Sequence, residues 1–429
     1  MIRLLVAFAT ILASALSANA GSSSHDLWRV CDGYEPGKSF IEAGAPESAE
    51  RLLGAYRGKW DNRLDHVLII DRIATDGTIS AYYAWARHPD WGIHKNACER
   101  HSGTLRNGMV SRRISREKEA RYALSPDGLL AGEYHFRSSV MIGLFHRFDP
   151  AGGEPETGDK LPDSLTFPSG YTSELIETGL IENGEAVRLQ IVVSKPNGPG
   201  PFPLLVFNHG SVGPGQGEAA ARAVRVFHPV TQYFLSKGWM VVAPQRRGRG
   251  WSDGLHDEGL VNDRSRYSCD PKIAIDGLNA AIEDVDAVME ILLARPEVDA
   301  ERVVMGGNSR GGGLSLAYAG KNPGKIRGAI NVSGGWHGTV CASFNSIHRR
   351  LTTDAARSPK PTLWLHGGKD DKIGLKPAKT VFDMFLREGG TGTFVPVPEA
   401  GHNLLWENRN WTQPVGHFMA DLGFSEFTE

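Results

Sequence analysis

The feature that most constrains the fold is the alternation of short apolar runs with longer helical stretches after about residue 170. An apolar run of four or five residues suits a strand buried on both faces, and an intervening helix allows successive strands to run parallel. The pattern therefore predicts an α/β fold with a mostly parallel, doubly wound sheet. The predicted strands are residues 189–193, 204–207, 240–243, 302–305, 328–332, 362–365 and 393–397, and the clearest helical stretch is 273–294.

The chain before residue 149 has shorter β-prone runs, joined by Asp-Gly or Asn-Gly pairs at 76–77, 107–108 and 127–128. Such pairs favour hairpins because both residue types accept positive φ at low cost. We therefore predict a small antiparallel β-domain, either a sheet or a barrel, over residues 21–148. Residues 149–170 are rich in Pro, Gly and acidic residues and are predicted to be a linker, followed by the α/β domain at 171–429.

The N-terminal twenty residues have the features of an export signal. Arg3 precedes an apolar run, and Ala18-Asn19-Ala20 has the small residues of a signal-peptidase site. The apolar run is shorter than the roughly 18 to 20 residues that a membrane span needs. We expect a cleaved signal peptide at residues 1–20 and a secreted or periplasmic protein, with an uncleaved anchor as the alternative.

Charge and cysteine spacing exclude several classes of partner. The 47 basic and 49 acidic residues leave a net charge of −2, which offers no field to attract nucleic acid or an anionic membrane. Neither partner is expected. The four cysteines show no paired C-x-x-C spacing, so no metal site is predicted, and no motif calls for a cofactor.

Reactive or conformationally special residues directly follow four of the predicted strands. Because parallel strands end at the same edge of a sheet, we expect these segments to converge on one site. They are Asn-His-Gly-Ser at 208–211, Gly-Gly-Asn-Ser-Arg-Gly-Gly at 306–312, His-Gly-Gly-Lys-Asp at 366–370 and Glu-Ala-Gly-His at 399–402.

From about residue 171 onward these motifs resemble the α/β-hydrolase fold, and within it the dienelactone-hydrolase-like and prolyl-oligopeptidase-like branch. The nucleophile elbow GxSxG matches 307–311, the acid motif HGxxDxxV matches 366–373 with isoleucine in place of valine, and the GH motif matches 401–402. The resemblance implies Ser309 as nucleophile, Asp370 as acid and His402 as base, in the chain order of this fold. Asp371, the next residue, stays an alternative acid.

The chemistry explains why these residue types are needed. A serine hydroxyl attacks a carbonyl only when a neighbouring base takes its proton, and an imidazole, with an unperturbed pKa near 6.5, suits that task. The resemblance also implies an oxyanion hole made by the backbone N–H of Arg310 and by that of Ser211, or alternatively Gly210. The side chain of His209 is expected to be a structural part of its turn.

The segment after residue 245 resembles the RGxGxS loop of this family, which lies at the rim of the site. Arg247 and Arg249 are candidates for binding an acidic substrate group, and the alternative is a solvated loop whose arginines pair with nearby carboxylates. Trp336 follows another strand and either lines the acyl pocket or belongs to the core.

The resemblance implies a serine hydrolase that cleaves small-molecule or glycan carboxylic esters through an acyl-enzyme. One alternative is a peptidase of the prolyl-oligopeptidase type, although the chain before residue 171 is too short for the β-propeller those enzymes usually carry. Another is a binding protein on a hydrolase fold. A dienelactone hydrolase proper has cysteine where Ser309 stands, so that activity is in doubt.

The even number of cysteines fits an oxidising compartment. Cys31 and Cys98 flank much of the N-terminal β-domain. In the α/β-hydrolase layout, Cys269 before the long helix and Cys341 after a strand end both lie near the carboxyl edge of the sheet. We therefore predict the pairs Cys31–Cys98 and Cys269–Cys341, with four separate thiols as the alternative.

Overall fold

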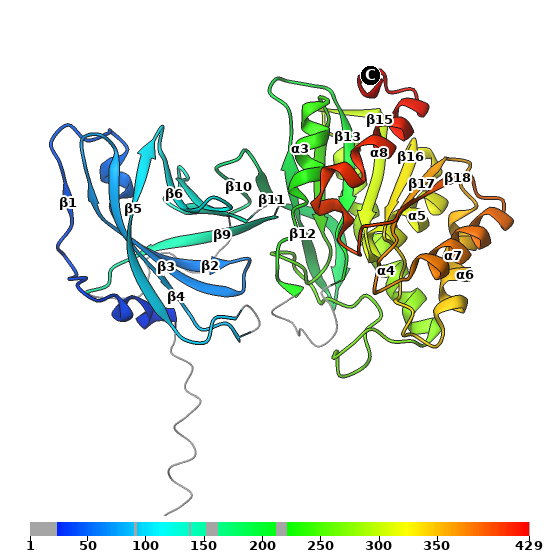
Figure 1. Ribbon diagram of the computed structural model, residues 1–429, viewed down its shortest axis with the longest axis horizontal. Helices are drawn as coiled ribbons and strands as arrows, with labels where there is room; N and C mark the ends of the chain where they lie inside the picture. Colours follow the sequence, from blue (N-terminus) through cyan, green and yellow to red (C-terminus); the bar gives the residue numbers. More distant parts are fainter. Residues whose placement is uncertain (1–23, 90–91, 137–138, 152–161, 212–220, 429) are drawn as a thin grey trace, which may run out of the picture.

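The computed structural model describes residues 24–89, 92–136, 139–151, 162–211 and 221–428. The predicted signal peptide and part of the predicted linker lie outside these residues. Two β-structures, one in each half of the chain, lie next to each other (Figure 1). None of the helices in the described part of the chain combines the length with the apolar character that a bilayer crossing requires.

The N-terminal structure is an antiparallel barrel, so of the two forms expected from the sequence the barrel is the one that occurs. Neighbouring strands pair in the order β3-β2-β9-β8-β7-β6-β5-β4, and β4 pairs with β3 to close the ring. Turn pairs make the hairpins, for example Asn107 and Gly108, both with positive φ, between β5 and β6. The strands are β1 (Phe40–Ile41), β2 (Gly54–Trp60), β3 (Leu64–Ile73), β4 (Thr78–Trp85), β5 (Ala97–Arg106), β6 (Met109–Ser115), β7 (Lys118–Leu124), β8 (Leu130–Phe136) and β9 (Ser139–Phe148), with the helix α1 at Ala49–Leu52 and a 3₁₀ turn at Ser24–Val30.

The second half contains the predicted doubly wound sheet. Its strand order is β10-β11-β12-β14-β13-β15-β16-β17-β18, and all pairs from β14 to β18 are parallel. β10 lies within the stretch predicted to be a linker, yet it pairs with β11 at the sheet edge. The strands are β10 (Ser164–Thr166), β11 (Thr172–Glu182), β12 (Glu185–Ser194), β13 (Phe202–Asn208), β14 (Met240–Gln245), β15 (Val298–Asn308), β16 (Gly328–Val332), β17 (Thr362–Gly367) and β18 (Gly392–Val397).

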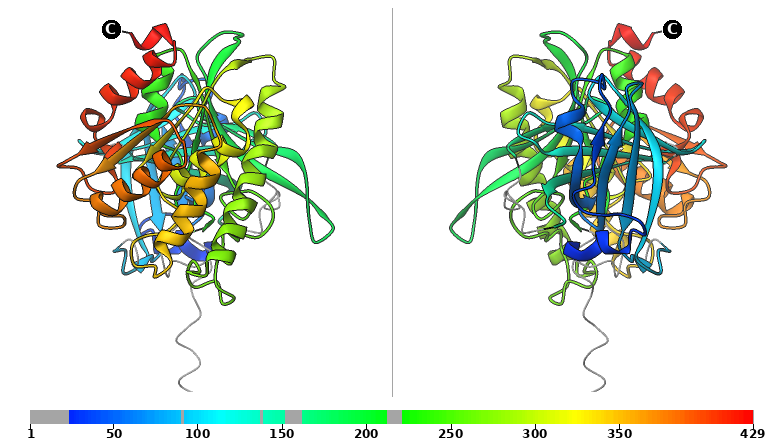
Figure 2. Two further views of the ribbon diagram at one scale, coloured as in Figure 1. Left: turned by 90° about the vertical axis from the view of Figure 1, so that its right-hand side faces the viewer. Right: turned by 90° about the vertical axis from the view of Figure 1, so that its left-hand side faces the viewer.

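Helices cover both faces of this sheet (Figure 2). One apolar core packs α4 (Pro271–Leu293), α5 (Arg310–Lys321), α6 (Phe344–Ala355) and α7 (Leu375–Arg387) against one face. A second core packs α3 (His228–Ser236) and α8 (Thr412–Asp421) against the other face. The central strands β13, β14, β16 and β17 are buried on both faces and contain the continuous apolar runs that the sequence predicted, whereas the edge strand β18 is partly exposed.

An apolar cluster joins the barrel to the α/β part. It contains Leu129, Ala131, Ile142 and Leu144 of the barrel and Phe167, Tyr171, Val224 and Trp251 of the second half. Asn62, in the turn between β2 and β3, adds polar contacts: its Nδ2 donates to the carbonyl of Arg222 at 2.8 Å, and its Oδ1 accepts from Nε1 of Trp251 at 2.8 Å. The barrel therefore holds the loop that follows β14.

Candidate active site

Ser309 forms a sharp turn between β15, which ends at Asn308, and α5, which begins at Arg310. Its φ of 57° and ψ of −125° lie in a region that residues with a β-carbon rarely occupy, so the turn is strained. A β-carbon at Gly311 would lie 2.1 Å from the carbonyl oxygen of Asn208, and one at Gly307 would lie 2.4 Å from the backbone of Gly311. The glycines thus let the strand, turn and helix pack closely around the hydroxyl.

The side chains of Ser309, His402 and Asp370 form one hydrogen-bonded row. Nε2 of His402 lies 3.0 Å from Oγ of Ser309, and Nδ1 lies 2.9 Å from Oδ2 of Asp370. When Nδ1 carries the ring proton, it donates to Asp370, and Nε2 accepts from the serine hydroxyl. The row can therefore pass the serine proton to the imidazole. Its three members follow β15, β17 and β18, whose carboxyl ends share one edge of the sheet.

The carboxylate in this row belongs to Asp370, whereas Asp371 points elsewhere. Oδ1 of Asp370 accepts the backbone N–H groups of Lys372 at 2.8 Å and Ile373 at 3.0 Å. Burial raises the pKa of Asp370, but the hydrogen bond from His402 and these N–H groups outweigh it and hold the pKa below its usual value. The side chain of Asp371 is 71% exposed and pairs with Nζ of Lys372 at 3.0 Å.

Sequence reasoning gave no role to His366, the first residue of the acid motif. The side chain is buried, and Nε2 lies 2.6 Å from the carbonyl of Ile373 and 3.3 Å from Oδ2 of Asp370. Burial lowers the pKa of His366, so the ring is neutral and donates to the carbonyl. His366 thus closes the loop that carries Asp370. Its place in the HGxxDxxV motif was the signal that could have identified it.

The candidate oxyanion donors lie beside Ser309. Arg310 is the first residue of α5, and the first N–H groups of a helix have no acceptor within that helix. Gly210 and Ser211 follow β13, the strand that pairs with β15. A β-carbon at Gly210 would lie 2.9 Å from Cβ of Ser309, so this loop packs directly against the serine turn.

The two arginines expected at the rim of the site, Arg247 and Arg249, are enclosed by neighbouring segments of the chain. Arg247 forms ion pairs with two carboxylates of α4, at 2.5 Å to Glu283 and 2.6 Å to Asp284. Arg249 is fully buried, and its Nη2 lies 3.3 Å from the carbonyl oxygen of Gly210. The loop is therefore neither a solvated segment nor an exposed rim, because packing against α4 and the loop after β13 encloses it.

Trp336 belongs to the core. It is fully buried, and Nε1 donates to the carbonyl of Ala274 in α4 at 2.7 Å. The guanidinium of Arg310 lies 3.5 Å from the centre of the Trp336 ring and 3.9 Å from that of Tyr267, so it is held between two aromatic faces. This position fits the packing alternative for Trp336 rather than an acyl pocket.

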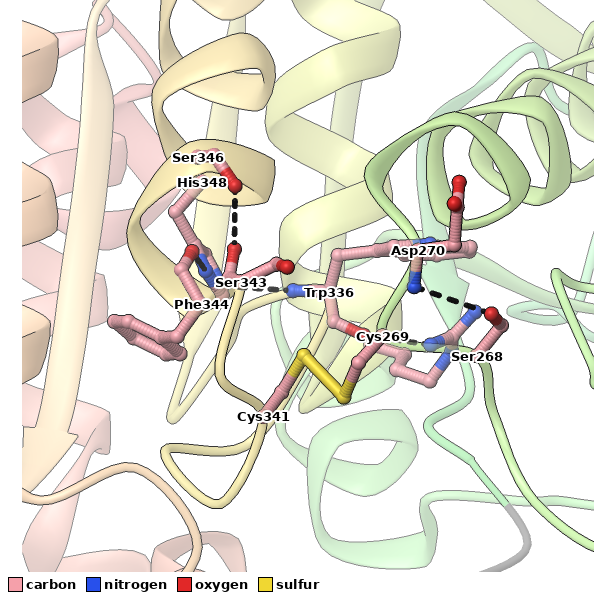
Figure 3. The surroundings of a disulfide bond; sticks show 10 residues. Ser268, Cys269, Asp270, Trp336, Cys341, Ser343, Phe344, Ser346 and His348 are labelled. Carbon is pink, nitrogen blue, oxygen red and sulfur yellow. Dashed lines mark hydrogen bonds between the residues drawn. A yellow bond between two sulfur atoms is a disulfide. The ribbon is translucent and has the colours of Figure 1, made fainter.

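The structure brings the four cysteines to disulfide distance in the two combinations that the sequence analysis predicted. Cys31 pairs with Cys98 and Cys269 with Cys341, with Cα atoms 5.0 Å and 5.6 Å apart. The second pair connects the segment before α4 to the loop before α6, close to Trp336 (Figure 3). A ring nitrogen of His337 lies within 4.8 Å of both sulfur atoms. Sulfur binds zinc as a thiolate, so these three side chains could hold a metal ion only with the two cysteines reduced.

Comparison with known proteins identifies the fold of the C-terminal part of the chain. Residues 203–347 match the family model described as alpha/beta hydrolase fold. A putative carboxymethylenebutenolidase of Methylorubrum extorquens is 28% identical over 122 residues, which are 28% of this chain and 40% of that protein. An acyl-protein thioesterase 1 homolog of Dictyostelium discoideum is 23% identical over 120 residues, which are 28% of this chain and 49% of that protein.

The chain thus spans less than half the length of these two curated relatives. Among solved structures, the acetyl xylan esterase 1 of a Thermoanaerobacterium species aligns with a TM-score of 0.41 and 18% identity, over 58% of this chain and 87% of that one. Together with the strand order, the family match shows an α/β-hydrolase fold in the C-terminal part, preceded by the barrel.

Proposed function

Because the C-terminal part of this chain has the α/β-hydrolase fold, we propose that the protein is a serine hydrolase that cleaves carboxylic esters, with Ser309 as nucleophile, His402 as base and Asp370 as acid. The observation that carries this proposal is the continuous hydrogen-bonded row from Ser309 through His402 to Asp370. Such a row meets the geometric requirement for an activated serine, which is a base within hydrogen-bond reach and a third group that orients the base.

The reaction follows from this geometry in two halves. Oγ of Ser309 attacks the ester carbonyl while Nε2 of His402 takes its proton, and Asp370 stabilises the imidazolium that forms. The tetrahedral intermediate then collapses, and the imidazolium gives its proton to the departing alcohol oxygen. Water attacks the acyl-enzyme with the same base, and the acid product leaves with Ser309 restored.

The negative charge of each intermediate requires hydrogen-bond donors. We assign this role to the backbone N–H of Arg310 at the start of α5 and to that of Ser211, or alternatively Gly210, in the loop after β13. One such donor contributes about 3 to 4 kcal/mol to the transition state. The packing of Gly210 against Ser309 supports a donor from that loop.

The names of the curated relatives, a carboxymethylenebutenolidase and a thioesterase, support hydrolase chemistry. A peptidase and a non-catalytic binding protein remain the rival functions. We also propose that the mature protein is exported after cleavage near Gly21. The two cysteine pairs support this, because disulfides persist in oxidising compartments.

The deciding experiment treats the mature protein with a fluorophosphonate probe and maps the labelled peptide. We expect one adduct at Ser309, none in Ser309→Ala, and turnover of aryl esters or acetylated sugars by the unlabelled enzyme. Turnover of aminoacyl-proline amides alone would establish the peptidase instead. A folded protein that takes no label and turns over neither class would establish a binding role.

A further inference from the structure

An unusual group of buried charges lies behind the loop that follows β13. Arg246, Arg249 and Arg310 are 1%, 0% and 4% exposed, and Glu258 is 4% exposed. Glu258 accepts from Nε of Arg246 at 2.7 Å and lies 3.5 Å from Nε of Arg310. The guanidinium groups of Arg246 and Arg310 therefore lie against this single carboxylate, and Arg249 is buried in the same group.

Two of these arginines hold the carbonyl oxygens of the loop. Nη1 and Nη2 of Arg246 donate to the carbonyl of His209 at 3.3 Å and 3.2 Å. Nη2 of Arg249 donates to the carbonyl of Gly210 at 3.3 Å. Nδ1 of the His209 ring also lies 3.1 Å from Nη2 of Arg249 and 3.3 Å from Nη2 of Arg246, and it accepts from them because a guanidinium nitrogen can only donate. Successive peptide groups of the loop are thus fixed by buried donors.

Because a peptide group is planar, a hydrogen bond to its carbonyl oxygen also fixes the direction of its N–H. A trans peptide is planar, and its C=O and N–H point in opposite directions. The hydrogen bond from Arg249 to the carbonyl oxygen of Gly210 therefore directs the N–H of Ser211, in the same peptide group, away from the arginines. In the same way, the hydrogen bonds that Arg246 donates to the carbonyl oxygen of His209 direct the N–H of Gly210 away from the arginines. Both candidate donors of the loop are oriented by an arginine.

Burying Arg249 in this position lowers the stability of the folded protein. Its Nε and Nη1 are buried and have no hydrogen-bond partner among the described residues. A buried cation with unmet donors lowers stability, so a purely structural site would be better served by an apolar side chain. Glu258 supplies a negative charge to this group, but the hydrogen bonds of Arg249 are made to His209 and Gly210, in the loop that packs against Ser309.

We propose that Arg249, supported by Arg246, is a positioning residue for the oxyanion hole. It holds the peptide between Gly210 and Ser211 in the orientation that presents its N–H to the reacting carbonyl, and its charge polarises that peptide. This inference rests on the proposed function, because the hole matters only if Ser309 forms a tetrahedral intermediate. Preorganised donors act in the transition state, so their alignment affects kcat rather than substrate binding.

The test compares Arg249→Met and Arg249→Lys with Arg295→Met. Arg295 is the control because it is also a largely buried arginine. It is ion-paired to Glu174 at 2.7 Å, and it lies before β15, at the opposite edge of the sheet from Ser309. Concentrations of active enzyme are set by titration with the fluorophosphonate, which removes any misfolded fraction from the comparison.

For Arg249→Met we expect kcat to fall about 10- to 100-fold. We expect KM to stay within about twofold, because ground-state binding is unchanged. The affinity for a trifluoromethyl ketone, whose hemiketal adduct with Oγ of Ser309 carries an oxyanion, should fall by the same factor as kcat/KM. Arg249→Lys should recover part of the loss, since an ammonium can donate to the carbonyl of Gly210, and Arg295→Met should match the wild type.

Unchanged kcat and ketone affinity in titrated Arg249→Met would overturn the positioning role. A crystal structure of Arg249→Met in the Ser309→Ala background gives an answer independent of activity. We expect the peptide between Gly210 and Ser211 to rotate, and an unmoved peptide would also overturn the proposal. Failure of the proposed function is separate, because it appears as a wild-type protein that takes no fluorophosphonate label.

Discussion

At the scale of residues, the candidate site depends on the hydrogen-bonded row from Ser309 to Asp370. It also depends on the glycines beside Ser309, which have no side chain and so let the turn pack closely. Asp370 is held as a carboxylate by His402 and by the N–H groups of its own loop, and the pKa of this carboxyl is lowered. Its charge therefore persists well into the acid range, where it can orient the imidazole. The exposed Asp371 has no such environment.

Substitutions in the row should act as a unit. Ser309→Ala and His402→Ala should each lower kcat by about 10⁴-fold or more, and the double variant should be no worse than either single one. Asp370→Asn should cause a loss of about 10⁴-fold because it favours the wrong imidazole tautomer. Asp371→Asn should stay close to the wild type. Steady-state kinetics with an aryl ester measure all five variants, and a large loss in Asp371→Asn would contradict the assignment of the acid.

At the scale of elements, close approach of β13, β15 and α5 creates the strained serine turn. Gly311, in the first turn of α5, contacts the backbone at the end of β13, and the side chain of Asn208 there donates to Oγ of Ser315 in α5 at 3.1 Å. The helix can thus approach the sheet edge only where side chains are missing. Glycine in this helix costs stability locally, and the close packing requires it.

Gly311→Ala should therefore destabilise the protein. Its β-carbon would meet the carbonyl oxygen of Asn208 at 2.1 Å, and relieving that overlap must shift backbone, at a cost of about 2 to 3 kcal/mol or more. Urea denaturation should show a lower midpoint, and fluorophosphonate labelling should slow. Gly324→Ala is the control, because its β-carbon would meet nothing within 4 Å. Equal stability of the two variants would argue against the close packing at the elbow.

At the scale of the whole molecule, the barrel is attached to the loops around the candidate site. Its turn between β2 and β3 carries Asn62, which binds Trp251 and Arg222, and Asp61, which is buried with one unpartnered carboxylate oxygen. Burial raises the pKa of Asp61 to about 6, against a partial opposing effect of Arg225. The junction between the two parts therefore contains a group that titrates in mildly acidic solution.

This predicts a specific dependence of stability on pH. Between the unfolded pKa of 3.8 and the folded value of about 6, the folded protein binds a proton that the unfolded chain does not. The contribution of Asp61 to stability is therefore full below pH 3.8 and is lost as the pH rises through about 6, a change of at most about 3 kcal/mol. In Asp61→Asn this loss should vanish.

Urea denaturation from pH 4 to pH 7 measures the effect. The free energy of unfolding of Asp61→Asn, relative to the wild type, should rise with pH across this range. Asp127→Asn, in the exposed turn between β7 and β8, should keep the wild-type profile. Parallel profiles for the wild type and Asp61→Asn would show that Asp61 does not titrate at the junction.

The sequence alone determined the features that are local in the chain. Apolar runs and helical stretches predicted the parallel sheet because a strand buried on both faces must be apolar throughout. The glycines around Ser309 predicted the sharp turn, because they relieve a local steric conflict. The motifs that follow β15, β17 and β18 predicted which side chains would lie at one edge, because parallel strands share their carboxyl ends.

Only the tertiary structure decided the features that depend on contacts between distant segments. Closure of the barrel needs β4 to pair with β3 as well as with β5, and turn residues do not specify that. The sequence around Arg247 and Arg249 looks like an exposed basic loop, but α4 and the loop after β13 enclose it and supply its partners. Burial and hydrogen bonding are properties of the packed chain, so a charged side chain in the sequence does not reveal whether it faces water or a buried carbonyl.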